Sequence, residues 1–254
     1  MNDKRKKEIT IFGISGIPEI EPGFDLGNII SKFLVGNFRP LNGDIIVIAQ
    51  KIISKSENCI SDISLIEPSR EALRISKITD KDPKLVQLIL NNSREIIRAS
   101  KGVLIVETTY GYICANAGVD SSNMNQENLY SFLPSNPDES AYKIRETVKK
   151  NFNVNVGVII SDTFNRPWRI GSINVALGFS GFDPLLNLIG EKDDFGNILK
   201  STLVNVADEI ASSAQLVMGE SSRVPVALVR GYGFKESNLK GYDLFRDKDK
   251  DLFR

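Results

Sequence analysis

Three short segments of the sequence combine acidic, hydroxyl and basic side chains in patterns that could bind a phosphate or a metal ion. The first is NAGVDSSN (116–123), in which Asp120 and Asn123 could face one ligand. Its Gly118 would allow a close approach of the backbone. An Asx-type turn that closes a hairpin explains the same residues, because Asn, Asp and Gly are common in turns. Composition alone leaves both interpretations open.

The second segment is SDTFNRPWRIG (161–171), which follows an apolar run. Asp162 and Thr163 offer two adjacent hard oxygen ligands, and the guanidinium groups of Arg166 and Arg169 suit phosphate. The alternative is a turn at a strand end in which an arginine packs on Trp168, the sole tryptophan. An acid, a hydroxyl and two arginines together make this pattern more specific than the first.

The third segment is MGESSRVP (218–225), between an expected helix and an expected strand. Its backbone amides and Glu220 could meet a phosphate–metal group, although Gly219 as a helix C-cap also accounts for the pattern. Lys51 and Lys55, on either side of Ser54, are the best additional basic anchors. Their alternative is two solvated lysines on a loop, because most lysines are exposed.

Composition narrows the chemistry. The 254 residues include no histidine, which excludes an imidazole base, a Ser-His-Asp triad and a histidine-bound zinc. Two cysteines cannot form a four-thiolate site. Any metal would therefore be held by oxygen ligands, which favour magnesium or manganese, cations that commonly work with phosphates. Neither a GxxxxGK[ST] phosphate loop nor a GxGxxG motif after a strand occurs, which disfavours P-loop and Rossmann nucleotide sites.

Charge and hydropathy indicate the setting. Lys plus Arg and Asp plus Glu are balanced at 32 each, which argues against a nucleic-acid partner. No apolar run approaches the ~18–20 residues of a membrane span. The basic N-terminal stretch lacks the features of a signal peptide. We expect a cytoplasmic protein with no membrane association.

Hydrophobic periodicity predicts the elements that must hold these segments. We expect strands at 9–12, 45–49, 102–107, 112–115, 156–160 and 225–229, the third and fourth forming a hairpin. We expect helices at 25–35, 69–78, 83–99, 139–151 and 203–218. Irregularly mixed helices and strands indicate an α+β fold. We treat 1–254 as one functional unit, compatible with one large domain or two subdomains, with a polar C-terminal tail at 235–254.

Motifs in series resemble the coenzyme F420-0:L-glutamate ligase family, also called F420 gamma-glutamyl ligase. No single motif is specific, but their order along residues 9–254 is. They are GIPEIEPGFDL, IISKSE, NAGVDSSN, SDTFNRPWRIG with VALGFSG, EKDDFGNIL, VADEIASSAQLVMGE, PVALVRG and the DLFR tail.

The resemblance implies a cytosolic ligase with its own α+β fold, no P-loop or Rossmann core, and an intertwined homodimer. Such enzymes use GTP, two divalent ions (Mn²⁺ or Mg²⁺) and a stimulating K⁺. They add L-glutamate to coenzyme F420-0, a deazaflavin with a phosphodiester-linked lactyl group, and release GDP and phosphate. A second, gamma-linked glutamate often follows. GTP would phosphorylate the acceptor carboxylate, and the amine of glutamate would attack the acyl phosphate.

Site residues are carried over from the matching motifs. Asp120 and Asp162 are expected to bind one divalent ion, and Thr163 and Glu220 the other. Arg166 and Arg169 are expected to act in catalysis by holding the acceptor's phosphate or the transferred phosphoryl group. The expected nucleotide contacts are Ile17, Pro18, Gln50, Lys51, Lys55, Asn123, Met218, Gly219, Glu220, Ser221, Ser222, Arg223, Val224 and Pro225.

Three departures from the family pattern bear on the nucleotide loop. Asn165 stands where relatives have glycine, Gln50 where they tend to have serine, and Ser221–Arg223 replace a more glycine-rich loop. Two other functions share the phosphate–metal residues: a ligase that glutamylates another acid such as a folate, and an inactive nucleotide-binding protein of the same fold. The intact acidic set argues against the second, since a decayed site would lose charged groups that reduce stability.

Overall fold

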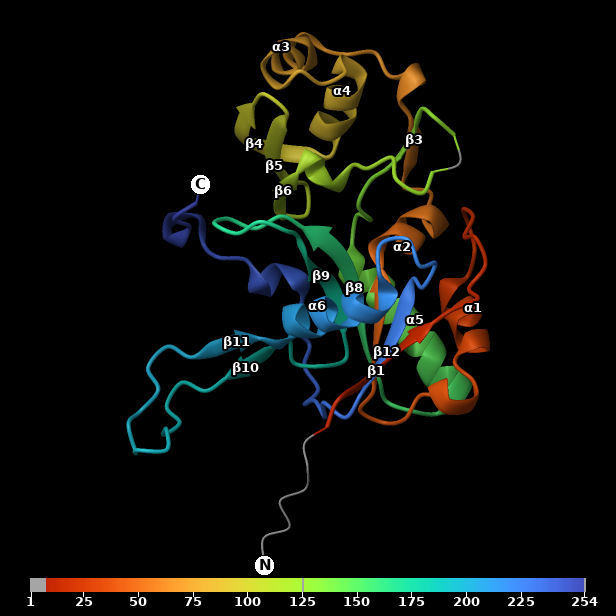
Figure 1. Cartoon of the computed structure of the whole chain (residues 1–254), viewed down its shortest axis with the longest axis vertical. Coiled ribbons are helices and arrows are strands. Elements are labelled where there is room, and N and C mark those ends of the chain that lie inside the picture. Colours follow the sequence, from red (N-terminus) through yellow and green to blue (C-terminus); the bar gives the residue numbers. More distant parts are fainter. Residues whose placement is uncertain (1–7, 125, 254) are drawn as a thin grey trace, which may run out of the picture.

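A five-stranded mixed sheet forms the larger part of the chain, and a smaller unit lies at one end of it (Figure 1). The computed structural model describes residues 8–124 and 126–253. Strand order in the sheet is β1-β12-β2-β8-β9. The strands are β1 (Thr10–Ile14), β12 (Val226–Arg230), β2 (Ile45–Ala49), β8 (Gly157–Phe164) and β9 (Ile173–Ser180). Only β2 and β8 are parallel neighbours; the other pairs are antiparallel.

Helices cover both faces of this sheet, which explains why its strands are continuous apolar runs rather than alternating ones. Ile46 and Ile48 face a core shared with α1 (Leu26–Phe33) and α5 (Pro137–Phe152). Ile45 and Val47 face a second core under α6 (Val206–Met218). The central strands are therefore fully buried, and the polar ends of these strands are the parts free to bind a ligand.

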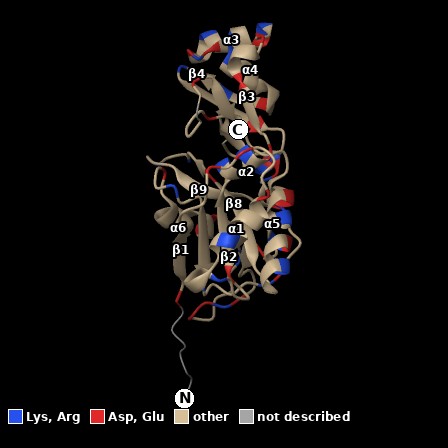
Figure 2. Cartoon of the chain, turned by 90° about the vertical axis from the view of Figure 1, so that its right-hand side faces the viewer, with Lys and Arg blue, Asp and Glu red and all other residues tan. Residues whose placement is uncertain are grey.

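The smaller unit comprises residues 60–132 and has its own core. Its elements are β3 (Ile60–Asp62), α3 (Arg70–Thr79), α4 (Pro83–Asn91), β4 (Ser93–Ser100), β5 (Val103–Thr108), β6 (Ile113–Ala115) and β7 (Leu129–Ser131). β4-β5-β6 form an antiparallel sheet, and β3 pairs with β7. Helix α2 (Gln50–Ser56) joins the unit to the end of β2. Figure 2 shows the unit standing beyond the end of the main sheet, with α2 between them.

Two further segments extend from the main sheet. A two-stranded arm of β10 (Leu185–Asn187) and β11 (Leu203–Asn205) projects away from it (Figure 1). The C-terminal segment contains two short 3₁₀ helices, Gly241–Leu244 and Lys248–Lys250, and ends between the sheet and the smaller unit. Arg254 of the expected tail lies outside the described residues, as do residues 1–7.

Most expected elements are present, and the mixed α+β class is confirmed. The helix expected at 83–99 is wrong beyond Asn91, because 93–100 is β4. Residues 50–56, considered as a loop, form α2. β9 had not been expected as a strand. Across the described ranges, no helix is long and apolar enough to cross a membrane.

Candidate functional site

One edge of the main sheet collects the predicted site segments. β2 and β8 run parallel, with Ala49 opposite Ser161, so the residues after each emerge side by side. β12 is antiparallel to β2, and Pro225 O, just before β12, accepts a hydrogen bond of 2.8 Å from Ala49 N. β1 also ends at this edge, since Ile14 pairs with Val226. Topology thus brings four distant chain segments together.

Asp162 and Thr163 lie on a strand overhang at this edge. The sequence predicted a strand ending at 160, but β8 continues to Phe164 and pairs with β9 beyond the last residue of β2. The register shifts between Ile160 and Ser161, as in a β-bulge. Bulges commonly lie next to active sites because they redirect side chains. The overhang therefore holds Asp162 and Thr163 on a rigid strand rather than on a loop.

Asp120 reaches the same edge from the smaller unit. Its backbone bridges to Ser131, and its carboxylate pairs with Lys51 in the first turn of α2 and accepts from the Ser122 hydroxyl. Partial burial favours the neutral acid, but the bonds from Lys51 and Ser122 outweigh that effect and hold the pKa of Asp120 below its ordinary value. Asp120 is thus a stable carboxylate.

Glu220 approaches Thr163 from the loop after α6. Thr163 Oγ1 lies 3.4 Å from Glu220 Oε1 and 3.0 Å from Asn174 Oδ1 of β9, so its single proton serves one acceptor at a time. Gln215 Nε2 donates to Glu220 Oε1 at 2.8 Å, and Asn174 Nδ2 donates to Gln215 Oε1 at 3.1 Å. Asn174 and Gln215 were not predicted; their only signal in the sequence is that they flank predicted site segments.

The pKa of Asp162 is raised to about 7, chiefly by burial and to a smaller extent by the nearby carboxylates of Asp120 and Glu220. The Thr163 backbone and Lys51 act in the opposite direction. A carboxylate enclosed by protein and facing other carboxylates is uncompensated in charge. Such a site favours a cation. Lys51 provides one positive charge, and a divalent ion would provide more.

In the expected pairs, Thr163 Oγ1 lies 3.4 Å from Glu220 Oε1, and Asp162 interacts electrostatically with Asp120. Among the described side chains, no three of the Asp, Glu and Cys type lie close enough to hold one ion. Two protein oxygens per ion leave positions for phosphate and water, which is how magnesium is usually bound beside a nucleotide. The residues present are therefore compatible with ions that bind together with a phosphate.

Predicted nucleotide residues on α2 are more enclosed than loop lysines would be. Lys55 is 9% exposed; its ammonium pairs with Glu19 and donates to Asn123 O at 2.8 Å. This pair joins the segment after β1 to the Asp120 loop. Gln50 is 3% exposed and binds Ser54 and the Phe132 carbonyl, so its side chain is occupied within the fold.

The segment 218–225 forms a loop at the site edge. Met218 is 2% exposed and packs in the core under α6, so its side chain does not face this edge. Glu220 and Ser221–Arg223 are exposed. Gly219 and Arg223 have positive φ angles of 63° and 55°. Val224 and Pro225 lead into β12, and an added Cβ at Gly13 of β1 would lie 2.9 Å from Val224.

The segment 15–18 lies beside this loop because it follows β1 directly. Ile17 is partly buried against the core shared with α1 and α5, whereas Pro18 is exposed. The structure therefore brings Ile17, Pro18, Lys51 and the 218–225 loop to one edge.

Arg166 and Arg169 lie in the loop that joins β8 to β9. Arg169 is exposed, and the Nε of Arg166 is buried with no hydrogen-bond partner among the described atoms. Trp168 is 87% exposed, so its ring does not fill the core. Its ring contacts Phe253 of the C-terminal segment, with centroids 5.8 Å apart.

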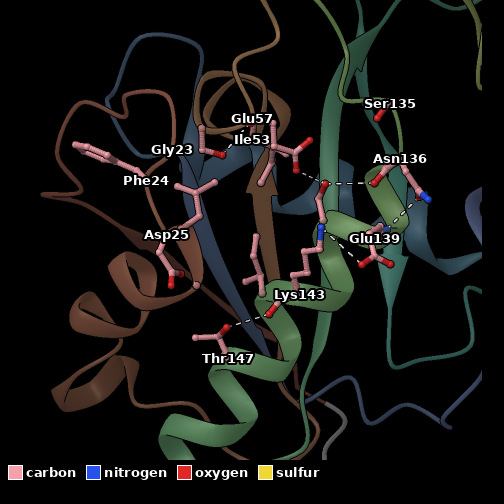
Figure 3. Close-up of a pocket in the computed structure, with 15 residues that line it drawn as sticks. Gly23, Phe24, Asp25, Ile53, Glu57, Ser135, Asn136, Glu139, Lys143 and Thr147 are labelled. Atoms are coloured by element: carbon pink, nitrogen blue, oxygen red, sulfur yellow. Dashed lines mark hydrogen bonds and ion pairs between the residues drawn. The ribbon is translucent and has the colours of Figure 1, made fainter.

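A separate cavity of about 340 Å³ lies on another side of α2, between α1 and α5 (Figure 3). Glu57, Glu139 and Lys143 line it, and Glu57 accepts a hydrogen bond from the buried Ser140 hydroxyl. None of the predicted site residues lines this cavity. Residues of the GFDL and IISKSE motifs line this cavity, so these motifs lie at the cavity and not at the candidate site.

Comparison with known proteins identifies similar sequences of known family. The profile of the family described as F420-0:Gamma-glutamyl ligase matches residues 15–231. A coenzyme F420:L-glutamate ligase of Methanocaldococcus jannaschii is 44% identical over 254 residues, 99% of each chain. The protein of that name from Methanothermobacter thermautotrophicus is 43% identical over 250 residues, 97% of this chain and 99% of its own. One from Methanococcus maripaludis strain C7 is 42% identical over 233 residues, 91% of each.

Proposed function

Because the chain belongs to the F420-0:gamma-glutamyl ligase family, we propose that it uses GTP to join L-glutamate to coenzyme F420-0. The chain is an enzyme of the ligase class. The observation that carries the finer proposal is the meeting of Lys51, Asp120, Asp162, Thr163 and Glu220 at one sheet edge from four chain segments. An acidic site with flanking lysines suits a nucleoside triphosphate bound with divalent ions.

In this proposal, GTP phosphorylates the acceptor carboxylate and the amine of glutamate displaces the phosphate. One acceptor oxygen leaves with that phosphate, and a new amide bond forms. Two Mn²⁺ or Mg²⁺ ions, held by the two residue pairs, would neutralise the phosphate charge. Lys51 lies where it can bind the same phosphates, and Lys55 holds the Asp120 loop against the segment after β1. With no histidine in the chain, the proton acceptor is a carboxylate, a lysine, phosphate or water.

Arg166 and Arg169 are proposed to hold the acceptor's phosphodiester or the transferred phosphoryl group. Both lie in the loop that directly follows the Asp162 overhang. Within the described residues, neither makes an ion pair shorter than 4.0 Å. A guanidinium binds phosphate bidentately, which a lysine does less well. K⁺ as an activator, a second added glutamate and a cytoplasmic location complete the proposal, and these three rest on the family resemblance alone.

Product analysis tests the activity. Purified enzyme with coenzyme F420-0, L-glutamate, GTP and Mn²⁺ should give a product heavier by one glutamate residue, then two, with stoichiometric GDP. Omission of any component should abolish the product. A folate acceptor serves as the comparison: glutamylation of folate but not of F420-0 would replace this proposal with the related ligase.

Nucleotide choice and the intermediate are tested separately. We expect a kcat/KM for GTP well above that for ATP; comparable values would refute GTP specificity but leave the ligase. Acceptor labelled with ¹⁸O in its carboxylate should transfer one label to phosphate. Unlabelled phosphate would rule out the acyl phosphate.

A further inference from the structure

Asp138, in the first turn of α5, is a buried carboxylate that joins four parts of the chain. It is 2% exposed. Its Oδ1 accepts from Phe179 N of β9 at 2.9 Å, and its Oδ2 accepts from Gly241 N of the C-terminal segment, also at 2.9 Å. The Tyr110 hydroxyl of the smaller unit donates to the same Oδ2. A buried charge of this kind is stable only while its donors remain in place, so the four segments are held together.

The C-terminal segment fits this position closely. An added Cβ at Gly241 would lie 2.7 Å from the Leu177 carbonyl oxygen and 3.1 Å from the Tyr112 hydroxyl. Real Cβ atoms do not approach a backbone atom that closely, so only glycine allows the segment to lie directly on β9. The docking is therefore specific rather than a loose tail.

Aromatic contacts extend the same junction. Phe245 packs edge-on against Tyr112 and Tyr110, at centroid distances of 5.0 and 6.2 Å. Tyr112 also contacts Phe164, two residues beyond Asp162, at 6.2 Å. One continuous aromatic cluster thus links the C-terminal segment, the smaller unit and the strand overhang of the site. Aromatic pairs add about 0.5–1.5 kcal/mol each beyond the area they bury.

The candidate site is divided along the same boundary. Asp120 belongs to the smaller unit, whereas Asp162 and Thr163 lie on β8 of the main sheet and Glu220 lies in the loop after α6, which packs on that sheet. The distance from Asp120 to the other three site residues therefore depends on how the smaller unit is positioned against the main sheet. Lys51 and Lys55 connect them on the α2 side, and the Asp138 junction connects them on the other.

We infer that residues 241–245 are a strap that sets the smaller unit against the main sheet, and that Asp138, Tyr110 and Gly241 are positioning residues for the divided site. None of the three touches the candidate site. The strap lies outside the segment matched by the family profile, which ends at residue 231. The effect of the strap on catalysis rests on the proposed function, whereas its effect on the position of the smaller unit does not.

Distance measurements on the full chain test the strap. Spin labels at Leu73→Cys on α3 and Leu216→Cys on α6, both exposed, report the separation of the two units. The natural cysteines are buried, and excess unlabelled protein removes contributions from neighbouring subunits. Gly241→Ala and Tyr110→Phe should each broaden or shift the distance distribution. Tyr142→Phe on the exposed side of α5 is the matched control and should leave it unchanged.

Kinetics on the same proteins test the positioning role. Misplacement of Asp120 by about 1 Å should lower kcat by roughly 10- to 100-fold in Gly241→Ala, with a smaller loss in Tyr110→Phe and none in Tyr142→Phe. Unchanged distances in both variants would overturn the strap. Altered distances with unchanged kcat would overturn the positioning role. If Gly241→Ala fails to fold, Tyr110→Phe decides, because it removes one hydroxyl and keeps the ring. An inactive wild-type protein would count against the proposed function while the distances still test the strap.

Discussion

Asp162 is the residue at which burial and charge act most strongly together. Its pKa is raised to about 7 from an ordinary 3.8, so between these pH values the folded chain holds a proton that the unfolded chain releases. The stability that this proton provides is present below pH 4 and is lost as the pH rises through 7. Above pH 7 the folded protein carries an unfavourable, partly buried charge at Asp162 unless a cation binds.

We therefore predict two effects of Asp162→Asn. Turnover should be lost, since the change removes the charge with little change in volume. In chelator-treated protein, the variant should melt higher than wild type at pH 8, by at least the ~2–4 °C expected for 1 kcal/mol in a chain of this size, and equally at pH 4. Wild-type activity under saturating Mn²⁺ would refute the metal assignment, and an equal melting difference at both pH values would refute the raised pKa.

Arg166→Lys and Arg169→Lys separate a functional loop from a structural one. A guanidinium that holds phosphate should, when replaced, lower kcat or raise KM for GTP or the deazaflavin by about tenfold or more, with little change in melting temperature. Arg74→Lys, which affects only a surface pair with Glu71, is the control. Variants that lower only the melting temperature would show that the loop is structural.

Residue types and spacing alone identify the site residues by type but not by grouping, and the expected pairing of Asp120 with Asp162 and of Thr163 with Glu220 came from the family resemblance. Asp162 beside Thr163 is visible in the printed order, whereas the approach of Glu220 and Asp120 depends on strand pairing. The enclosure of Lys55 and Gln50 could not be predicted, because residues 50–56 lack the length that makes a helix recognisable. The exposure of Trp168, which reaches 87%, could not be read from the sequence either.

At the scale of elements, the loop after α6 places Glu220 through the backbone of Gly219. Its φ is 63°, and an added Cβ would lie 2.5 Å from Ser222 Oγ. Gly219→Ala should therefore distort this loop and reduce kcat/KM for GTP several-fold. Gly196→Ala is the matched control. The φ of Gly196 is 86°, so alanine there is also strained in its backbone, but no atom lies close enough to collide with the added Cβ. Equal activity of the two variants would show that the loop conformation does not matter.

β4 shows why one element was mistaken for a helix. Its pairing with β5 shifts register between Ser93 and Glu95 and again between Ile96 and Arg98. These irregularities disrupt the alternation that identifies a strand, and the apolar residues that remain resemble a continuation of α4. The long helix α5 was expected at 139–151 and spans Pro137–Phe152, and its Asn136 cap and Pro137 mark a start two residues earlier than expected.

For the whole molecule, the β10–β11 arm offers an apolar surface suited to the homodimer that the family resemblance implies. Phe195 is 93% exposed at its tip, and Ile189 and Ile198 are more than half exposed. Exposed apolar patches of this kind mark contacts between proteins. Light scattering should give twice the chain mass for the wild type, and Phe195→Asp should shift the protein toward monomer. Leu65→Asp, at another largely exposed site on the smaller unit, should not. An active wild-type monomer would refute the homodimer.

The strand order also determines the order in which the two units can fold during synthesis on the ribosome. β12 lies between β1 and β2, although it is the last strand synthesised, so the main sheet cannot be completed until residue 230 is available. β4, β5 and β6 pair with their immediate sequence neighbours and need nothing that comes later. The smaller unit can therefore fold while β1 and β2 still lack β12, the strand that lies between them. The long-range pairing of β12 should be the slow step. Pulsed hydrogen exchange during refolding should protect amides of β5 before those of β2; simultaneous protection would show that the two units fold together.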